Sequence, residues 1–257
     1  MSTEVFPYPT VKEVAFQITF PHLFSIENKI GDFQDKIVMQ FPDSALILRR
    51  QVVFADTGLE GKFESIPVKK GLEPETVRKI WVFKSKEKIE VSVQTNSITI
   101  VSQQHKTYNN PSSDKKFRDV IEFVIGNFFK TINVPIISRI GLRYIDECPL
   151  PSKDNETLEK LYDSTFPIDR FPVKDATGIY FSIITLRKNH RLVYQEGLAK
   201  NKQGQDVLML DFDGFETEIA SADFLKVADE LHGIIEEEYF SIIKEPIKEY
   251  MRTGKLP

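Results

Sequence analysis

The amino-acid sequence predicts an α+β protein built around an antiparallel sheet, and three features of its 257 residues indicate that class. Several segments alternate apolar and polar side chains with the period of two that is typical of half-buried strands. Three of the predicted strands follow one another with only short polar turns between them, which indicates antiparallel pairing. The order strand, helix, several strands, helix occurs twice along the chain, and this order favours helices packed on one face of the sheet.

The first half of the chain, residues 1–132, contains one copy of this order. Alternating apolar side chains in residues 12–20 predict its first strand. Apolar residues three or four positions apart predict amphipathic helices over residues 25–41 and 114–133. Runs rich in β-branched residues predict the strands between the two helices: residues 45–55, 79–84, 88–94 and 97–102.

The second half, residues 133–257, repeats the order without visible sequence identity to the first. Alternation predicts its first strand over residues 136–146, and helical spacing predicts a short helix over residues 154–166. A long helix is predicted over residues 221–251, with a kink at Pro246 because proline cannot donate the helical hydrogen bond. The strands between the two helices are predicted at residues 178–186, 191–198 and 206–213.

Both halves therefore have the predicted order β-α-β(3–4)-α, and we expect two topologically similar modules joined near Asn133. Such modules would form one curved antiparallel sheet or two abutting sheets, with the helices on one face. This arrangement is similar to the TATA-binding-protein-like and helix-grip folds. A fold of this kind does not by itself determine a function.

Composition excludes several classes of protein. Hydrophobic residues make up 41% and charged residues 28% of the chain, which excludes collagen-like, low-complexity and wholly disordered sequences. The net charge is −4, with acidic residues concentrated between Asp211 and Glu249, which argues against a surface wholly devoted to nucleic acid. A single cysteine, Cys148, excludes an intrachain disulfide and a multi-thiolate metal site.

The N-terminal region does not have the pattern of a secretory signal, and no segment approaches the roughly 18 apolar residues of a membrane span. We therefore expect a cytoplasmic protein without a membrane partner.

Three blocks of sequence carry a resemblance to a known family. They are PTVKEV at residues 9–14, RIGLRYI at residues 139–145, and the C-terminal segment that begins at Leu231 and His232 and ends at Met251. These blocks resemble the signature of a sporadically distributed prokaryotic family of uncharacterised proteins of about this length. The resemblance implies an accessory role in bacterial antiviral defence or a toxin–antitoxin system, and it implies no catalytic residues.

The position that follows RIGLRYI departs from the pattern of that family. The resemblance implies Asn or a similar polar residue there, whereas this chain has Asp146.

Arg139 and Arg143 form the first candidate site. Alternation places them on one face of the strand at residues 136–146, about 13 Å apart. A guanidinium group binds phosphate or carboxylate with two parallel hydrogen bonds, so this face is a candidate surface for a protein partner. Tyr144 in the same motif and Glu13 on the first strand complete the set of partner-binding candidates.

The alternative for the two arginines is a structural one, in which each forms an ion pair with an acidic residue of a neighbouring strand or of the last helix. Glu13 would pair with Arg143 if the first strands of the two halves were neighbours.

A basic segment at residues 69–88 is the second candidate site, for nucleic acid. Trp81 and Phe83 lie within it, where they would either stack on bases or pack into the core. The basic candidates are Lys69, Lys70, Arg78, Lys79 and Lys84.

The sequence predicts no catalytic set, metal site or cofactor. His232 shares a helix face with Asp229 and Glu236, but a second histidine at helical spacing is missing, so a partly buried histidine hydrogen-bonded to an acidic neighbour is the favoured interpretation. The acidic run at residues 206–218 lacks the spacing of a calcium loop, and a strand that ends in a turn at Gly214 explains it more simply.

We therefore expect a non-enzymatic binding or regulatory protein that recognises a macromolecular partner, with self-association as a further option. Two alternatives remain: a nucleic-acid-binding protein, and a metal-dependent nuclease or hydrolase that uses Glu13, Asp146 or His232. The 20 phenylalanines would either form a solid core or line an apolar ligand cavity. The most informative observation about function would be a pocket of roughly a few hundred Å³ lined by convergent polar groups.

Overall fold

The structure, a computed structural model, describes residues 4–50, 77–105 and 107–256. Its strands are β1 (Val11–Thr19), β2 (Asp43–Arg50), β3 (Val77–Lys84), β4 (Ile89–Gln94), β5 (Ser97–Ser102), β6 (Ile136–Pro149), β7 (Tyr180–Arg187), β8 (His190–Lys200) and β9 (Asp206–Ala220). Its α-helices are α1 (Ile26–Ile37), α2 (Phe117–Thr131), α3 (Asn155–Leu161), α4 (Phe224–Ile242) and α5 (Glu245–Thr253).

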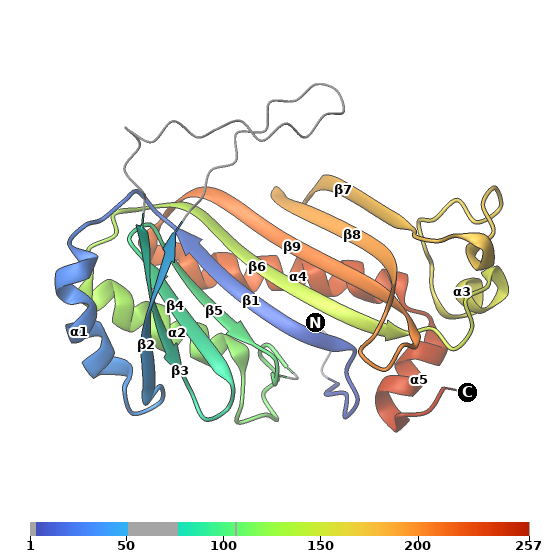
Figure 1. The fold of residues 1–257 in the computed structure, drawn as a ribbon, viewed down its shortest axis with the longest axis horizontal. Coiled ribbons are helices and arrows are strands. Elements are labelled where there is room, and N and C mark those ends of the chain that lie inside the picture. Colours follow the sequence, from blue (N-terminus) through green and yellow to red (C-terminus); the bar gives the residue numbers. More distant parts are fainter. Residues whose placement is uncertain (1–3, 51–76, 106, 257) are drawn as a thin grey trace, which may run out of the picture.

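The described residues form a single antiparallel sheet of nine strands in the order β2-β3-β4-β5-β1-β6-β9-β8-β7 (Figure 1). The α+β class and the antiparallel sheet predicted from the sequence are therefore confirmed. The first strands of the two halves, β1 and β6, are antiparallel neighbours in the middle of this sheet.

The alternation in each strand separates the two faces of the sheet. Val14, Phe16 and Ile18 of β1 are buried on the face that the helices cover, and Leu142 of β6 is buried on the same face. Figure 1 shows α4 running along β6 and β9 on one side of the sheet. Aromatic contacts such as that between Phe212 of β9 and Tyr239 of α4, at 6.3 Å between ring centroids, join the helices to this core. We call the opposite side the outer face.

The C-terminal segment differs from the single kinked helix that the sequence predicts. It forms α4 and α5, which are separated by Ile243 and Lys244. Ile243 forms an isolated β-bridge with Tyr162, so the chain leaves helical geometry there. Pro246 lies in the first turn of α5, where the missing N–H has no helical acceptor to lose, and it therefore begins a helix instead of kinking one.

Two further boundaries differ from the predictions. Strand β9 continues through Gly214 to Ala220, so the predicted turn at Gly214 is wrong. A Cβ atom at Gly214 would lie 3.3 Å from the Cδ1 atom of Ile235, so the glycine allows α4 to pack closely against the strand. Helix α3 is shorter than the predicted helix at residues 154–166.

Some predictions fall on residues 51–76, which lie outside the described residues. They are the second part of the strand predicted at residues 45–55 and the nucleic-acid candidates Lys69 and Lys70. None of the described helices is both long and apolar enough to cross a membrane.

Candidate functional site

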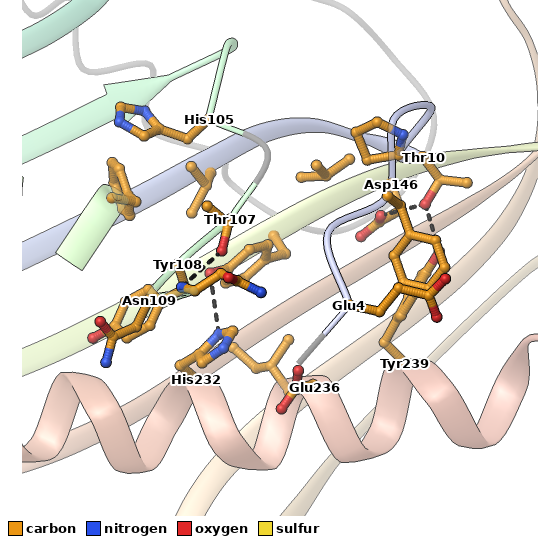
Figure 2. A pocket seen from close by; sticks show the side chains of 18 of the residues that line it. Glu4, Thr10, His105, Thr107, Tyr108, Asn109, Asp146, His232, Glu236 and Tyr239 are labelled. Carbon is orange, nitrogen blue, oxygen red and sulfur yellow. Dashed lines mark hydrogen bonds between the residues drawn. The ribbon is translucent and has the colours of Figure 1, made fainter. Parts of the chain in front are cut away.

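A cavity of about 400 Å³ lies between the sheet and helix α4 (Figure 2). We call it the central pocket. Strands β1 and β6, helix α4, the segment before β1 and the loop after β5 contribute its walls. The apolar and aromatic residues that line it are Phe6, Pro9, Val11, Val14, Pro111, Phe117, Ile235, Phe240 and Met251. Its polar residues are Glu4, Thr10, His105, Thr107, Tyr108, Asn109, Asn110, Tyr144, Asp146, Asp229, His232, Glu236 and Tyr239.

Two local features of the strands bring polar groups to this pocket. Alternation along β6 places Tyr144 and Asp146 on the helix-covered side, two residues apart. The β1–β6 pairing shifts register between Val11 and Glu13, so one residue of β1 is a bulge there. A bulge redirects the side chains beyond it, and Thr10 lies beyond this one with its hydroxyl against Asp146.

Asp146 is a buried carboxylate at the end of a short chain of hydroxyl groups. The Thr10 hydroxyl donates to Oδ1 of Asp146 at 2.7 Å, and it lies 2.6 Å from the Tyr239 hydroxyl (Figure 2). The Tyr239 hydroxyl has two possible acceptors for its one proton, the Thr10 oxygen and the Met251 sulfur at 3.3 Å. The Thr10 hydroxyl is therefore the group that donates directly to Asp146.

Only one oxygen of Asp146 is satisfied in this way. Its Oδ2 atom has no hydrogen-bond partner in the described part of the chain. Every fully buried side-chain oxygen or nitrogen of the described residues has a hydrogen-bond partner. Because Oδ2 has none, it is not fully buried, and we infer that it is in contact with the open space of the pocket that Asp146 lines. Burial raises the pKa of Asp146 to about 7, although the hydrogen bond from Thr10 opposes this shift.

His232 contributes a neutral ring to the opposite wall. The ring is stacked on Tyr108 at 4.1 Å between centroids, and its Nδ1 atom shares a hydrogen bond of 3.2 Å with the Tyr144 hydroxyl. Burial lowers the pKa of His232 to about 4, so the imidazole is uncharged at neutral pH. His232 is partly buried, as predicted, but its hydrogen-bond partner is Tyr144 and not an acidic neighbour.

Three other described carboxylates line the pocket, Glu4, Asp229 and Glu236, and two of them are paired with arginines. Asp229 accepts hydrogen bonds from Nε and Nη2 of Arg118 at 2.9 and 3.1 Å, and a third from the Tyr108 hydroxyl. Glu4 forms an ion pair with Arg252 at 2.8 Å. Such a pair compensates the charge of the carboxylate, whereas Asp146 forms no ion pair among the described residues.

The two arginine candidates lie on the outer face, away from the pocket. Arg139 forms an ion pair with Asp213 at 2.7 Å, and Arg143 forms one with Asp211 at 2.5 Å, both on the neighbouring strand β9. The structure thus shows the ion pairs of the structural alternative. A Cβ atom at Gly141 would lie 2.5 Å from Nη1 of Arg139, so this glycine leaves the space through which Arg139 reaches Asp213.

The other two partner-binding candidates are separated from each other. Although β1 and β6 are neighbours, Arg143 pairs with Asp211, and Glu13 accepts a hydrogen bond from Gln103 at 3.1 Å. Tyr144 lies on the opposite side of the sheet, in the central pocket. The structure therefore does not bring the four residues together into one surface.

The nucleic-acid candidates in the described residues lie around β3. Arg78 is exposed, Lys79 forms an ion pair with Glu27, and Lys84 forms one with Glu90. Phe83 is buried and Trp81 is partly buried against the core, so both aromatic side chains pack inside the protein. Within the described ranges, no group of three or more His, Cys, Asp and Glu residues is arranged to hold a metal ion.

Sequence reasoning did not find the central pocket, because it depends on contacts between distant segments. The sequence pattern does not indicate Thr10 or Tyr239 as site residues, and it indicates Asp146 only as a residue of an enzyme and His232 as either a structural residue or a residue of an enzyme. One signal pointed to the pocket. Each of the three blocks that carry the family resemblance contributes lining residues, namely Thr10, Tyr144 and His232 respectively.

Comparison with known proteins adds nothing to this geometry. No protein-family model matches the chain, and a search of curated proteins finds no similar sequence. The interpretation of the pocket therefore rests on its own chemistry.

Proposed function

We propose that this protein is a non-enzymatic binding protein and that it holds a small organic ligand in the central pocket. The observation that carries this proposal is a buried carboxylate, Asp146, with one oxygen that faces a cavity of about 400 Å³. Ligand sites in proteins are typically cavities of this size, with mostly apolar walls and a few polar groups that orient the ligand.

The residue types of the pocket wall favour binding over covalent catalysis. None of the described lining residues is Ser, Cys or Lys. Cys148 is fully buried, and burial raises the pKa of its thiol, which keeps it unreactive.

We also infer that the two halves are related modules, as the sequence order suggests. In each half the first strand pairs with the last one, β1 with β5 and β6 with β9. The pocket includes the junction of the two modules, where β1 meets β6. Ligand sites occur preferentially at such junctions.

A fragment screen tests the proposal. A library of fluorinated aromatic fragments of positive, neutral and negative charge is screened against the full chain by ¹⁹F NMR. A Val11→Trp variant, in which the pocket is blocked, is the control. Val11 is a partly buried residue of the lining, so an indole group at this position would fill the space in front of it. We expect fragments to bind the wild-type chain and to lose at least tenfold in affinity in the variant. Absence of binding, or equal binding to a folded Val11→Trp variant, would overturn the proposal.

Recognition of a protein partner, which the sequence led us to expect, is a second candidate function, and the edge strand β7 favours it. In the described part of the sheet, β7 pairs only with β8. Its large apolar side chains are exposed on both faces: Tyr180, Ile183, Ile184 and Leu186. An unprotected apolar edge of this kind is a typical site for the addition of another strand.

A second copy of this chain is the partner that best fits this edge. Antiparallel pairing of β7 with itself would place Ile183 opposite Ile184, and Ser182 opposite Thr185. Light scattering after size-exclusion chromatography tests this candidate. We expect a dimer at tens of micromolar chain that an Ile184→Lys variant converts to a monomer, and a monomeric wild-type chain would exclude it.

A further inference from the structure

We propose that the ligand of the central pocket is an organic cation, a protonated amine with an apolar or aromatic body, and that its ammonium group binds Oδ2 of Asp146. This inference rests on the proposed function and assigns a ligand class to it. It depends on the charges around the pocket, on the nature of its walls, and on the position of Asp146.

The charges around the pocket favour a positive ligand. Arg252 and Arg118 compensate Glu4 and Asp229, whereas Asp146 forms no ion pair in the described chain. His232, the ring on the wall formed by α4, is uncharged at neutral pH because burial lowers its pKa. When Asp146 is ionised, its buried negative charge therefore has no positively charged partner among the described residues. A cationic ligand would provide that partner.

The walls of the pocket are suited to the same class of ligand. Tyr144 and Tyr239 flank Asp146 from β6 and α4. Aromatic rings attract ammonium groups through their negative faces, and this attraction is stronger in a desolvated site. Phe117, Phe240 and Ile235 provide apolar surface for the body of the ligand. An anionic ligand would instead meet an unscreened carboxylate, and a neutral ligand would leave it unpaired.

The hydrogen bond from Thr10 also suits Asp146 to the binding of an ammonium group. While Asp146 is ionised, Thr10 stabilises Oδ1 and leaves Oδ2 as the acceptor that faces the cavity. An ammonium group has three donors and no acceptor, so it matches an acceptor-only carboxylate oxygen. A bond of this kind is charge-assisted and stronger than one between neutral groups.

Binding of a cation must compete with protonation of Asp146. Besides burial, Thr10 lowers the pKa of Asp146 and Asp211 of β9 raises it. The other titratable groups near it are Tyr144 and Cys148 on β6 and Tyr239 on α4, whose own pKa values Asp146 raises, and Glu236, which lines the pocket from α4. Burial raises the pKa values of both tyrosines and of Cys148, so these three stay protonated and neutral at neutral pH. We therefore expect affinity for an amine to rise with pH up to about 7, where Asp146 becomes ionised, and to level off above it.

Three probes of nearly equal shape test the charge preference: phenethylamine, 2-phenylethanol and phenylacetate. Their affinities for the full chain are measured by calorimetry at pH 7.5. We expect phenethylamine to bind at least tenfold more tightly than the other two. Lowering the pH to 5.5 should weaken amine binding about tenfold or more and leave 2-phenylethanol unchanged.

An Asp146→Asn variant then identifies the group that confers the preference. Asparagine has nearly the same shape as aspartate and lacks its charge, so the variant should lose at least tenfold in affinity for phenethylamine and keep its affinity for 2-phenylethanol within twofold. An Asp169→Asn variant is the matched control, because Asp169 is exposed and does not line the pocket, and it should bind all three probes like the wild type.

The outcomes separate the two proposals. If 2-phenylethanol or phenylacetate binds more tightly than the amine, and Val11→Trp abolishes that binding, the cation proposal is overturned while the pocket remains a ligand site. Amine binding that is insensitive to Asp146→Asn and to pH also overturns it. If no probe or fragment binds in a way that Val11→Trp abolishes, both proposals are wrong.

Discussion

Among the residues that the structure describes, two carboxylates are buried on the helix-covered side of the sheet, and their surroundings differ. Glu196 on β8 has no exposed surface, and Asp146 on β6 has 5%. Glu196 accepts hydrogen bonds from the Ser164 hydroxyl, from the backbone N–H and hydroxyl of Thr165, and from the Tyr194 hydroxyl. From the described residues, Asp146 accepts a single hydrogen bond, from Thr10. Equal burial therefore does not imply an equal role.

The number of donors explains the difference. A buried carboxylate with donors on both oxygens is compensated by the protein itself, and Glu196 holds the segment around Ser164 and Thr165 against β8. A buried carboxylate with one donor is compensated only in part, so its pKa rises, as it does for Asp146. The first arrangement is structural, and the second leaves an acceptor for a ligand.

The largest expected effect on stability comes from removing the carboxylate of Glu196. A Glu196→Ala variant would leave four donors without their acceptor, each of which costs about 1–3 kcal/mol when buried, so we expect a loss of about 5 kcal/mol of unfolding free energy. Urea denaturation measures it. Glu196→Gln, which keeps one acceptor oxygen, should recover part of the loss. A loss below about 1 kcal/mol would show that the donors find other partners.

The second prediction concerns Asp146 and pH. Its folded pKa of about 7 lies above the usual value for aspartate, so the folded chain keeps a proton that the unfolded chain releases. The stability that Asp146 contributes is present at low pH and is lost as the pH rises to about 7. The range extends from the usual aspartate pKa of about 4 to about 7. Across it, we expect the unfolding free energy of Asp146→Asn to rise relative to that of the wild type by about 1.4 kcal/mol per pH unit, which is about 4 kcal/mol in total. A pH-independent difference would contradict the assignment of a shifted pKa to Asp146.

The third prediction concerns His232, whose contribution to stability changes with pH in the opposite direction to that of Asp146. Because burial lowers the folded pKa of His232 to about 4, its contribution to stability is present above the usual histidine range and is lost as the pH falls to about 4. We expect a His232→Gln variant, which keeps a hydrogen-bonding group near Tyr144, to lack this acid sensitivity. The wild type should lose about 3 kcal/mol relative to the variant between pH 6.5 and 4. Parallel stability curves for the two chains would show that His232 does not titrate in this range.

The smallest expected effect extends the comparison to a carboxylate on the outer face. A Gly141→Ala variant would push the Arg139 guanidinium away from Asp213, and we expect a loss of about 1 kcal/mol, because this ion pair is only partly exposed. In an Arg139→Ser background the same glycine substitution should cost nothing. Thermal unfolding of the four chains in this double-mutant cycle measures the coupling, and additive losses would show that Gly141 has another role.

Part of the candidate site could be predicted from the sequence. The side chains of β6 were correctly assigned to two faces, Arg139 and Arg143 to one and Tyr144 and Asp146 to the other, because alternation depends only on the geometry of a single strand. The partners of these residues could not be predicted. Arg143 pairs with Asp211 because β9 lies beside β6, and sequence distance does not determine which strands become neighbours.

The sequence by itself determined the α+β class, the antiparallel meander of β3, β4 and β5, and the amphipathic faces of the helices. These features follow from local periodicity and turn residues, which act over a few positions. Only the tertiary structure decided the break between α4 and α5, the continuation of β9 through Gly214, and the pocket around Asp146. Each of these depends on contacts between segments far apart in the chain, such as those of Thr10 with Asp146 and Tyr239. The local sequence around each residue does not predict such contacts.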